Sequence, residues 1–410
     1  MNGKNFLIAG IVMISALVSF AEEETDILRL QIGKNTLKEK TMTIFPDKIY
    51  AAESGKSVSF VEMVQRMADS RLIYVGETHN SLPMHEIQAR IIEALYEKDR
   101  ELSVGLEMYP VTQQEVLNKW SLGILSEEEF IRDGQWYVTW NFHFGFYRDI
   151  FQAAKKNAIP LYALNVPRDI ISSIRMKGWN ALQEEEKEMV PEPDLTNQDH
   201  RTLIRTIFAS SDLPPQMKGK GLEMVFEGLY RAQTAWDETM ARYALEGLNK
   251  EGGKMVVLAG SGHLLYNLGI NLRAYNKNRL PFKTVICVVI PEGEESIQVS
   301  RSLADFVWGL PEEEKPAFPS VGLRLKQFEG LENLVIERDP IDGVALGRDF
   351  KKGDVILAVD GQRFTDMNEL RVYLSGFTWG DRATFQLLRD AQQIEAVLEF
   401  QMSEEKIEKP

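Results

Sequence analysis

Four strand-like runs, each followed at once by polar residues, are the feature that most constrains the fold of this chain. The runs are LIYVGETH (72–79), SVGLEMY (103–109), PLYALNVPR (160–168) and MVVLAGSGH (255–263). They are rich in Val, Ile and Leu without polar alternation, as is typical of strands covered on both faces. The stretches between them are long enough for helical crossovers, and residues 84–98 have the period of an amphipathic helix. The sequence therefore predicts an α/β domain with a mostly parallel sheet flanked by helices.

Composition divides the rest of the chain. Residues 172–228 are strongly helical and charged, which predicts a helical cap inserted into an α/β domain of residues 22–310. Residues 311–318 are dominated by Pro and Glu without an apolar pattern, which is typical of a linker. Residues 319–402 contain short strand-like runs, turns and at least one helix-like run, so we expect a small second domain, followed by a tail at 403–410.

The first residues predict export. Lys4 precedes an apolar run from Phe6 to Val18, and small residues then lead to Ala21, the pattern of a signal peptide (residues 1–21) cleaved after Ala21. The run is shorter than the roughly 20 residues of a membrane-spanning helix, so an uncleaved anchor is the weaker alternative. No Cys near this position could accept a lipid. We therefore expect a periplasmic or secreted protein.

Charge and cysteine content restrict the possible partners. The net charge of -14 argues against nucleic acid as a partner, because an acidic surface repels phosphate. The single cysteine, Cys287, lies in the strand-like run TVICVVI, where we expect an inert buried thiol.

Polar side chains follow the predicted strands at the point where each strand ends. Ligands of open parallel sheets bind beyond the carboxyl ends of the strands, where such side chains can converge. We therefore predict one shared ligand-binding cleft. Its candidate residues are Glu77, His79, Glu107, Tyr109, Asn165, Arg168 and His263.

Two of these strand ends share the pattern Gly-x-x-His, at Gly76 to His79 and at Gly260 to His263. We expect each Gly to allow a tight turn directly after its strand, so that the His folds back over the sheet edge. Two such motifs are informative in a sequence with only five His residues. For either His alone, the alternative is a structural role such as capping a helix.

Two acids lie within apolar patterns. Glu107 interrupts a buried run, and burial of a carboxylate requires a partner such as a cation, a metal or a His. Structural ion pairing with Arg168 is the alternative. Asp237, on an otherwise apolar helix face, is a second buried-acid candidate.

The other His residues and the aromatic residues suggest further roles. His85 is a candidate to face the cleft, whereas His143 and His200 are expected to be satisfied or solvated imidazoles. The aromatic stretch 135–147 is by default core. It could also offer a flat wall to a planar ligand, with the phenol of Tyr109, Tyr137 or Tyr147 available to a ferric centre.

Together these motifs resemble the ChaN-like haem-binding uptake proteins, over about 48–290, and more distantly the Tiki metalloproteases, TraB proteins and erythromycin esterases. The resemblance implies an α/β fold with a helical cap, haem as the cofactor and a role in iron or haem uptake. Many members are lipoproteins, and this sequence departs from them by lacking the lipid-accepting Cys. The matching positions are Gly76, Glu77, His79, Glu107, Asn165, Pro167, Arg168, Gly260 and His263.

The C-terminal region resembles a PDZ domain of the bacterial type. The resemblance is carried, in order, by VGLRL (321–325), GDVILAVDGQ (353–362) and DMNELRVYL (366–374). It implies that the peptide of a protein partner adds as a strand between Leu323 to Leu325 and the helix, with its carboxylate held by loop amides. The expected peptide-binding residues are Gly322, Leu323 and Leu325.

Two functions follow, and the closer resemblance favours the first. The first is an exported protein that binds haem or another small ligand and docks through its PDZ domain. The second is a hydrolase in which His79, His263 and Glu77 hold a divalent ion such as Mn or Zn, and Glu107 activates water. A metal-free esterase with His79 as the base is a weaker variant. A pure scaffold is disfavoured by the intact strand-end residues, and a homodimer stays an open alternative.

Overall fold

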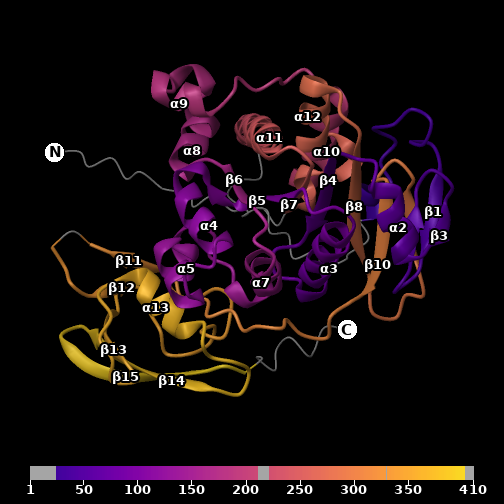
Figure 1. Cartoon of the computed structure of the whole chain (residues 1–410). Coiled ribbons are helices and arrows are strands. Elements are labelled where there is room, and N and C mark those ends of the chain that lie inside the picture. Colours follow the sequence, from indigo (N-terminus) through magenta and orange to yellow (C-terminus); the bar gives the residue numbers. More distant parts are fainter. Residues whose placement is uncertain (1–24, 211–220, 329, 402–410) are drawn as a thin grey trace.

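The computed structural model describes residues 25–210, 221–328 and 330–401, and an eight-stranded sheet forms its centre (Figure 1). The strand order is β3-β2-β10-β8-β4-β7-β5-β6. The four strand-like runs form β4 (Leu72–Glu77), β5 (Leu102–Pro110), β6 (Leu161–Asn165) and β7 (Lys254–Gly260). Because β4, β7, β5 and β6 are parallel neighbours, their carboxyl ends meet at one edge. This confirms the predicted α/β fold with a mostly parallel sheet.

Shorter strands extend the sheet on one side. β8 (Phe282–Ile290) and β10 (Phe306–Pro311) continue the parallel order, and β2 (Ile49–Ala51) and β3 (Lys56–Val58) add an antiparallel hairpin at the edge. A separate pair joins β1 (Thr41–Ile44) to β9 (Ile297–Ser300). The strands of three or four residues could not be predicted from the sequence, because such segments are too short to display a period.

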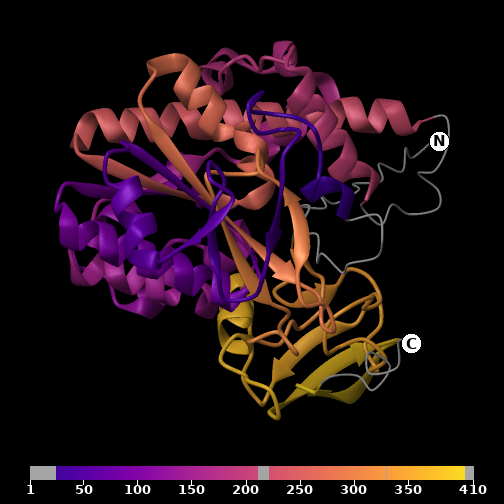
Figure 2. The ribbon, with the colours of Figure 1, turned by 90° about the vertical axis from the view of Figure 1, so that its right-hand side faces the viewer.

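Helices cover both faces of the sheet (Figure 2). Ile73 and Val75 of β4 belong to a core with Ile91, whereas Leu72 and Tyr74 belong to the core on the opposite face. The first face carries α2 (Phe60–Met67), α3 (Leu82–Lys98), α4 (Gln114–Ser121) and α7 (Arg148–Lys156). The second carries α10 (Gln198–Ala209), α11 (Leu222–Glu251) and α12 (Ile270–Asn278).

The region expected to form a helical cap contains α8 (Arg168–Lys177), α9 (Glu184–Met189), α10 and the first turns of α11. Three further short helices are α1 (Thr25–Leu28), α5 (Glu127–Asp133) and α6 (Trp136–Thr139). Within the described part of the protein, none of these helices combines the length and the apolar character needed to cross a membrane. The expected signal peptide and the tail at 403–410 lie outside the described residues.

A five-stranded antiparallel sheet with its own core forms the C-terminal domain. Its order is β11-β12-β13-β14-β15, which leaves β11 at the edge, and its helix is α13 (Met367–Leu374). The loop before β11 requires Gly322, because φ is +76° there and an added Cβ would collide with the carbonyl oxygen of Asp342. The strands are β11 (Leu325–Gln327), β12 (Leu334–Ile336), β13 (Val355–Val359), β14 (Arg382–Arg389) and β15 (Gln392–Glu399).

The central position of β7 gives a stability prediction. Leu258 of β7 is fully buried, so Leu258→Ala should lower the free energy of unfolding by about 2–5 kcal/mol through lost contacts and a cavity. The matched control is Leu122→Ala, because Leu122 is 71% exposed, and it should change this free energy by less than about 0.5 kcal/mol. Urea unfolding followed by tryptophan fluorescence measures both. Equal effects of the two substitutions would contradict the central placement of β7.

Candidate functional site

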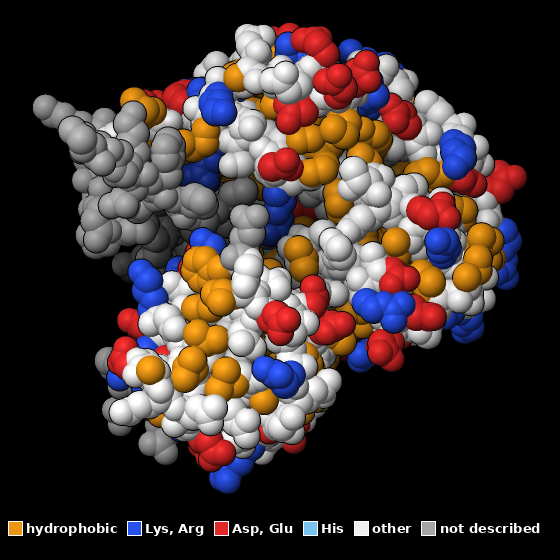
Figure 3. Space-filling view, turned by 90° about the vertical axis from the view of Figure 1, so that its left-hand side faces the viewer, with side chains coloured by type: hydrophobic (Ala, Val, Ile, Leu, Met, Phe, Trp, Pro, Cys, Tyr) orange, Lys and Arg blue, Asp and Glu red, His pale blue; other side chains and the backbone are white. Residues whose placement is uncertain are grey.

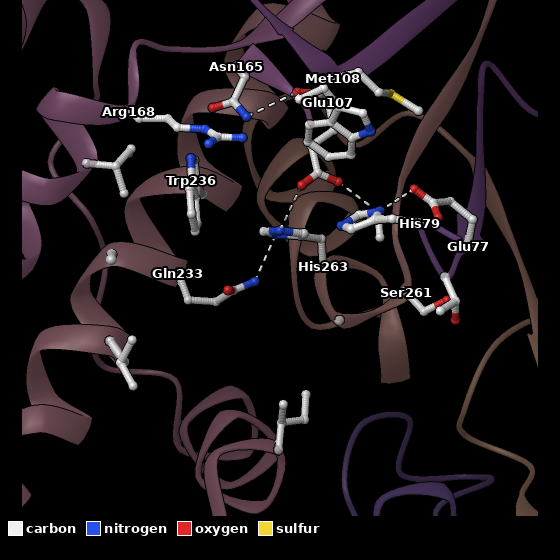
Figure 4. Close-up of a pocket in the computed structure, with 18 of the residues that line it drawn as sticks. Glu77, His79, Glu107, Met108, Asn165, Arg168, Gln233, Trp236, Ser261 and His263 are labelled. Carbon is white, nitrogen blue, oxygen red and sulfur yellow. Dashed lines mark hydrogen bonds and ion pairs between the residues drawn. The ribbon is translucent and has the colours of Figure 1, made fainter. Parts of the chain in front are cut away.

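A cavity of about 570 Å³ lies at the edge of the sheet where β4, β5, β6 and β7 end (Figure 4). Its floor is formed by these strand ends, and its sides come from α8, α11 and the segment that contains α6. The strand-end side chains of Glu107, His79 and His263 point toward one another at one end of it. The structure therefore brings together the imidazoles and acids that the sequence places far apart.

Glu107 is the acid at the centre of this group. Its side-chain oxygen Oε2 accepts a hydrogen bond of 2.7 Å from the backbone N–H of Gly260, and Oε1 lies 3.4 Å from Nε2 of His263. Burial would raise the pKa of Glu107, but the positive charge and hydrogen bond of His263, with His79 and Gly260, lower it to about 2. Glu107 is therefore an ionised carboxylate that joins the ends of β5 and β7.

His263 is held from behind by a second acid. Its Nδ1 lies 2.6 Å from Oδ1 of Asp237, and Nε2 of Gln233 lies 2.8 Å from the same nitrogen. Burial alone would lower the pKa of His263, but Glu107 and Asp237 raise it to about 10. His263 is therefore a cation between two carboxylates at neutral pH.

Asp237 is the fully buried acid of α11, and it binds more than one base. Besides His263, its carboxylate lies 3.2 Å from Nε2 of His200 and 3.6 Å from the guanidinium of Arg273. These partners hold the pKa of Asp237 at about 2, against the effect of burial. His200, expected to be a satisfied or solvated imidazole, is fully buried here.

His79 forms a similar pair with Glu77. Its Nδ1 lies 2.6 Å from Oε1 of Glu77, and this carboxylate also accepts a hydrogen bond of 3.3 Å from the hydroxyl of Tyr147. Burial opposes the charged form of His79, but Glu77 and Glu107 raise its pKa above the ordinary value. The ring lies edge-on to Trp140, with a centroid distance of 4.6 Å.

The two Gly-x-x-His motifs interlock, which corrects the reason expected for their glycines. Gly76 lies within β4, and an added Cβ would stand 2.5 Å from Cδ1 of Ile286 and 2.8 Å from Oγ of Ser261. A Cβ on Gly260 would stand 2.9 Å from Cε1 of His79. The φ of Gly260 is −53°, which any residue adopts. Each glycine therefore serves close approach rather than a turn that only glycine allows.

Asn165 and Arg168 lie where β6 leads into α8, and both line the cavity. The amide Nδ2 of Asn165 donates a 3.0 Å hydrogen bond to the backbone oxygen of Glu107, so Asn165 fixes β6 against β5. Burial lowers the pKa of Arg168, while the negative charge of Glu107 acts in the opposite direction. The strongest contacts of Glu107 are nevertheless those with His263 and Gly260.

None of the three predicted phenolic ligands is among the residues that line the cavity. Tyr109 is fully buried among Phe130, Trp136 and Phe151 and is not among the residues that line the cavity. Burial also raises the pKa of Tyr109 well above its usual value, so its phenol is neutral. The hydroxyls of Tyr137 and Tyr147 bind Phe144 and Glu77 respectively. This placement gives no support to a phenolate ligand.

His85 and His143 make structural contacts. The Nδ1 of His85 donates to the backbone oxygen of Ser81 at 2.6 Å, and its Nε2 lies 3.5 Å from Glu77, so His85 contacts the group without lining the cavity. His143 donates a hydrogen bond from Nε2 to the backbone oxygen of Ser375 in the C-terminal domain. Cys287 does line the cavity, but burial raises the pKa of its thiol to about 12, and the thiol stays neutral.

Some cavity residues were not predicted from the sequence. Gln233 and Trp236 face the cavity from α11, and the spacing Gln233, Trp236, Asp237, Met240 follows one helix face. Because Asp237 was recognised as a buried acid, its spacing of four residues from Gln233 could have predicted that Gln233 lies on the same helix face. Trp140 lies in the aromatic stretch 135–147, for which a wall facing a planar ligand was the alternative to a core position.

The predicted divalent-ion site is not found among the described residues, where no group of three or more His, Cys, Asp or Glu side chains is arranged to hold a metal. The proposed ligands are instead engaged with one another, since Glu77 binds Nδ1 of His79, and Asp237 and Glu107 flank His263.

Comparison with known proteins gives two family matches. The family described as haem-binding uptake, Tiki superfamily, ChaN matches residues 63–273, and the PDZ domain family matches residues 320–399. The curated protein RETICULATA-RELATED 5, chloroplastic, of Arabidopsis thaliana is 23% identical over 260 residues, which are 60% of this chain and 34% of that protein. The chain thus spans about a third of this relative's length.

Solved structures of similar shape are distant in sequence. ChaN of Campylobacter jejuni, described with cofacial heme binding, is 21% identical and covers 63% of this chain and 95% of its own, with a TM-score of 0.49. A mutant of erythromycin esterase EreC is 11% identical, covering 64% and 83%, with a TM-score of 0.36. The HtrA-type protease AlgW with a decapeptide is 23% identical, covering 20% and 28%, with a TM-score of 0.19.

The buried network around Asp237 gives a prediction. Asp237→Asn removes the buried anion that His263, His200 and Arg273 share, so the free energy of unfolding at pH 7 should fall by about 3–5 kcal/mol, although Glu107 still faces His263. The control, Asp133→Asn, removes an exposed acid and should cost less than about 1 kcal/mol.

The effect of Asp237→Asn should also depend on pH. Because the folded pKa of Asp237 is about 2, its stabilisation is complete above the ordinary pKa of about 3.9 and is lost as the pH falls between these values. The difference from the wild type should therefore shrink from pH 7 to pH 3 in urea unfolding. A difference that stays constant over this range would contradict the ionised network.

Proposed function

The chain belongs to the ChaN family of haem-binding uptake proteins in the Tiki superfamily and carries a PDZ domain, and from this premise we propose that its cavity binds haem. In this role the protein handles haem or iron during uptake, and the PDZ domain docks it to a protein partner. The signal peptide expected at residues 1–21 supports a place outside the cytoplasm.

The observation that carries this proposal is the carboxylate bound to each cavity histidine. A histidine that ligates a metal usually donates its other ring N–H to a carboxylate, which fixes the ring and raises its basicity. Glu77 occupies Nδ1 of His79, which leaves Nε2 for an iron. Nε2 of His263 already faces Glu107. We therefore assign the iron-binding role to His79, since histidine is a common haem ligand.

The remaining walls suit a planar ligand. The cavity volume of about 570 Å³ falls in the range of about 300–1,000 Å³ that is typical of small-molecule and cofactor sites. Trp140, Trp236 and Met108 offer apolar surface, and Arg168 and Arg175 face the cavity from α8. Haem supplies an iron and an apolar ring that bears carboxylate groups, and these arginines would pair with the carboxylates.

The edge strand of the PDZ domain supports docking to a peptide. β11 has one neighbour in the sheet, β12, so its other edge can receive an added strand. The loop with Gly322 and Leu323 precedes this edge, and Leu325 begins the strand. A peptide bound there by its carboxyl terminus would have its terminal carboxylate near the backbone amides of this loop.

A second candidate function is metal-free ester or peptide hydrolysis. The observation in its favour is the Glu77–His79 pair beside Glu107, because a histidine oriented by a carboxylate can serve as a general base. This candidate needs His79 as the catalytic residue that takes the proton of the attacking water. The two functions predict different effects of substituting His79: the first predicts a loss of haem affinity, and the second predicts a loss of hydrolysis.

Haem binding gives the first test. Hemin added to the wild-type protein should produce a saturable shift of the Soret band, and Glu77→Gln should weaken the affinity by about tenfold through the loss of support for His79. His79→Gln should weaken it further. Tyr109→Phe is the control, because its hydroxyl lies in the core, and it should bind as the wild type does. No saturable shift, or a loss with Tyr109→Phe alone, would refute the assignment.

Hydrolysis gives a separate test. We expect the wild type and His79→Gln to hydrolyse a p-nitrophenyl ester and a fluorogenic peptide at the same background rate. Turnover by the wild type that falls by about a hundredfold or more in His79→Gln would instead establish the second function. Circular dichroism checks that the variant is folded.

A further inference from the structure

One wall of the cavity is a segment that also faces the PDZ domain. Residues 135–140 include α6, and Gln135, Val138, Thr139 and Trp140 line the cavity. The same segment continues to Phe146, and α13 of the PDZ domain packs against α5 and α6. In Figure 1, α13 lies directly beside α5. This segment, residues 135–146, is called the cavity wall below; it has the cavity on one side and the PDZ domain on the other.

Named contacts hold this wall to the PDZ domain. The guanidinium of Arg371 on α13 donates to the backbone oxygen of Tyr137 in α6. Nε2 of His143 donates to the backbone oxygen of Ser375 at 2.7 Å, and Nδ1 of His143 accepts from the backbone N–H of Gly145 at 3.0 Å. Both ring nitrogens of His143 are therefore satisfied in its neutral form.

The linker that precedes the PDZ domain packs against the same segment through Phe318. His143 stacks on Phe318, with ring centroids 4.0 Å apart and planes inclined by 11°. A side chain on Gly145 would collide with the ring of Phe318, so glycine is required for this approach. The hydrogen bonds at Tyr137 and His143, together with the ring packing at His143, therefore hold this segment against α13 and the linker.

The charge of Arg371 also interacts with that of Arg168, although Arg371 is not among the residues that line the cavity. Desolvation lowers the pKa of Arg371 to about 10, and the positive charges of Arg168 and Arg324 act in the same direction. Arg168 itself lines the cavity. The hydrogen-bond acceptor of Arg371 is a neutral carbonyl, so that bond does not cancel its charge. Figure 3 shows basic side chains in the hollow between the two domains.

We propose that the PDZ domain is a part of the ligand site: Arg371 positions the cavity wall through its hydrogen bond to the backbone oxygen of Tyr137. Arg371 is thus a positioning residue that acts on the site from the other domain. The identity of this ligand as haem rests on the function proposed above.

Three variants of the full-length protein test this inference. Arg371→Gln removes the guanidinium that donates to Tyr137, and we expect hemin affinity to fall about tenfold, which corresponds to about 1.4 kcal/mol. Arg371→Lys keeps a donor of similar length, and it should recover part of the loss. The matched control is Arg382→Gln, because Arg382 is an exposed arginine of the same domain that pairs with Glu399 at 3.2 Å. It should bind hemin as the wild type does.

A ligand without carboxylates separates positioning from charge. Arg371→Gln should weaken binding of haem dimethyl ester and of hemin to a similar extent, because the displaced wall is the same for both ligands. A loss confined to hemin would show that Arg371 acts by its charge and would overturn the positioning role. Equal hemin affinities of Arg371→Gln and Arg382→Gln would overturn the inference as a whole.

A measurement without ligand keeps this test independent of the proposed function. Amide hydrogen exchange in residues 135–147 should be faster in Arg371→Gln than in Arg382→Gln, because the wall has lost its hydrogen bond to α13. If the wild type binds no hemin but this difference is present, the proposed function fails and the positioning role stands. Unchanged exchange overturns the positioning role.

Discussion

The buried carboxylate of Glu107 is the charge on which the arrangement of the site depends. A carboxylate within a sheet is tolerated only with strong partners, because its desolvation is costly. Here the partners are the Gly260 amide and the His263 imidazole, both supplied by the end of β7. Asn165 binds the backbone of the same residue from β6. The carboxylate of Glu107 therefore joins the ends of β5 and β7, its backbone joins β5 to β6, and together these contacts fix the floor of the cavity.

The two histidines at this end of the cavity have the same pattern of contacts. Two histidines approach Glu107, and each has a carboxylate at Nδ1, Glu77 for His79 and Asp237 for His263. Contacts between the motifs, His79 against Gly260 and Ser261 against Gly76, keep the pairs in register. The pairs nevertheless differ, because His263 is flanked by two acids, whereas the carboxylate of Glu77 contacts Nδ1 of His79. This difference is why the proposed binding role is assigned to His79.

Much of this site could be predicted from the sequence, for physical reasons. Buried parallel strands appear as continuous apolar runs, so their ends, and the polar residues there, were identifiable. Tyr109 could not be placed by the same rule. It lies two positions from Glu107 and would share its face in a regular strand, but the pairing of β5 with β6 is irregular between Leu106 and Pro110. Contacts across domains, such as Arg371 with Tyr137, leave no local pattern at all.

The PDZ domain contacts the segment that lines the cavity, so both domains take part in the proposed ligand binding. In this proposal, imidazoles and acids from separate strands form one haem site. A crystal structure of the protein soaked with hemin tests this most directly. We expect hemin to be bound in the cavity, with His79 and Arg168 among the residues that would hold it. A porphyrin bound outside the cavity, or an iron bonded to a residue remote from His79, would contradict this expectation.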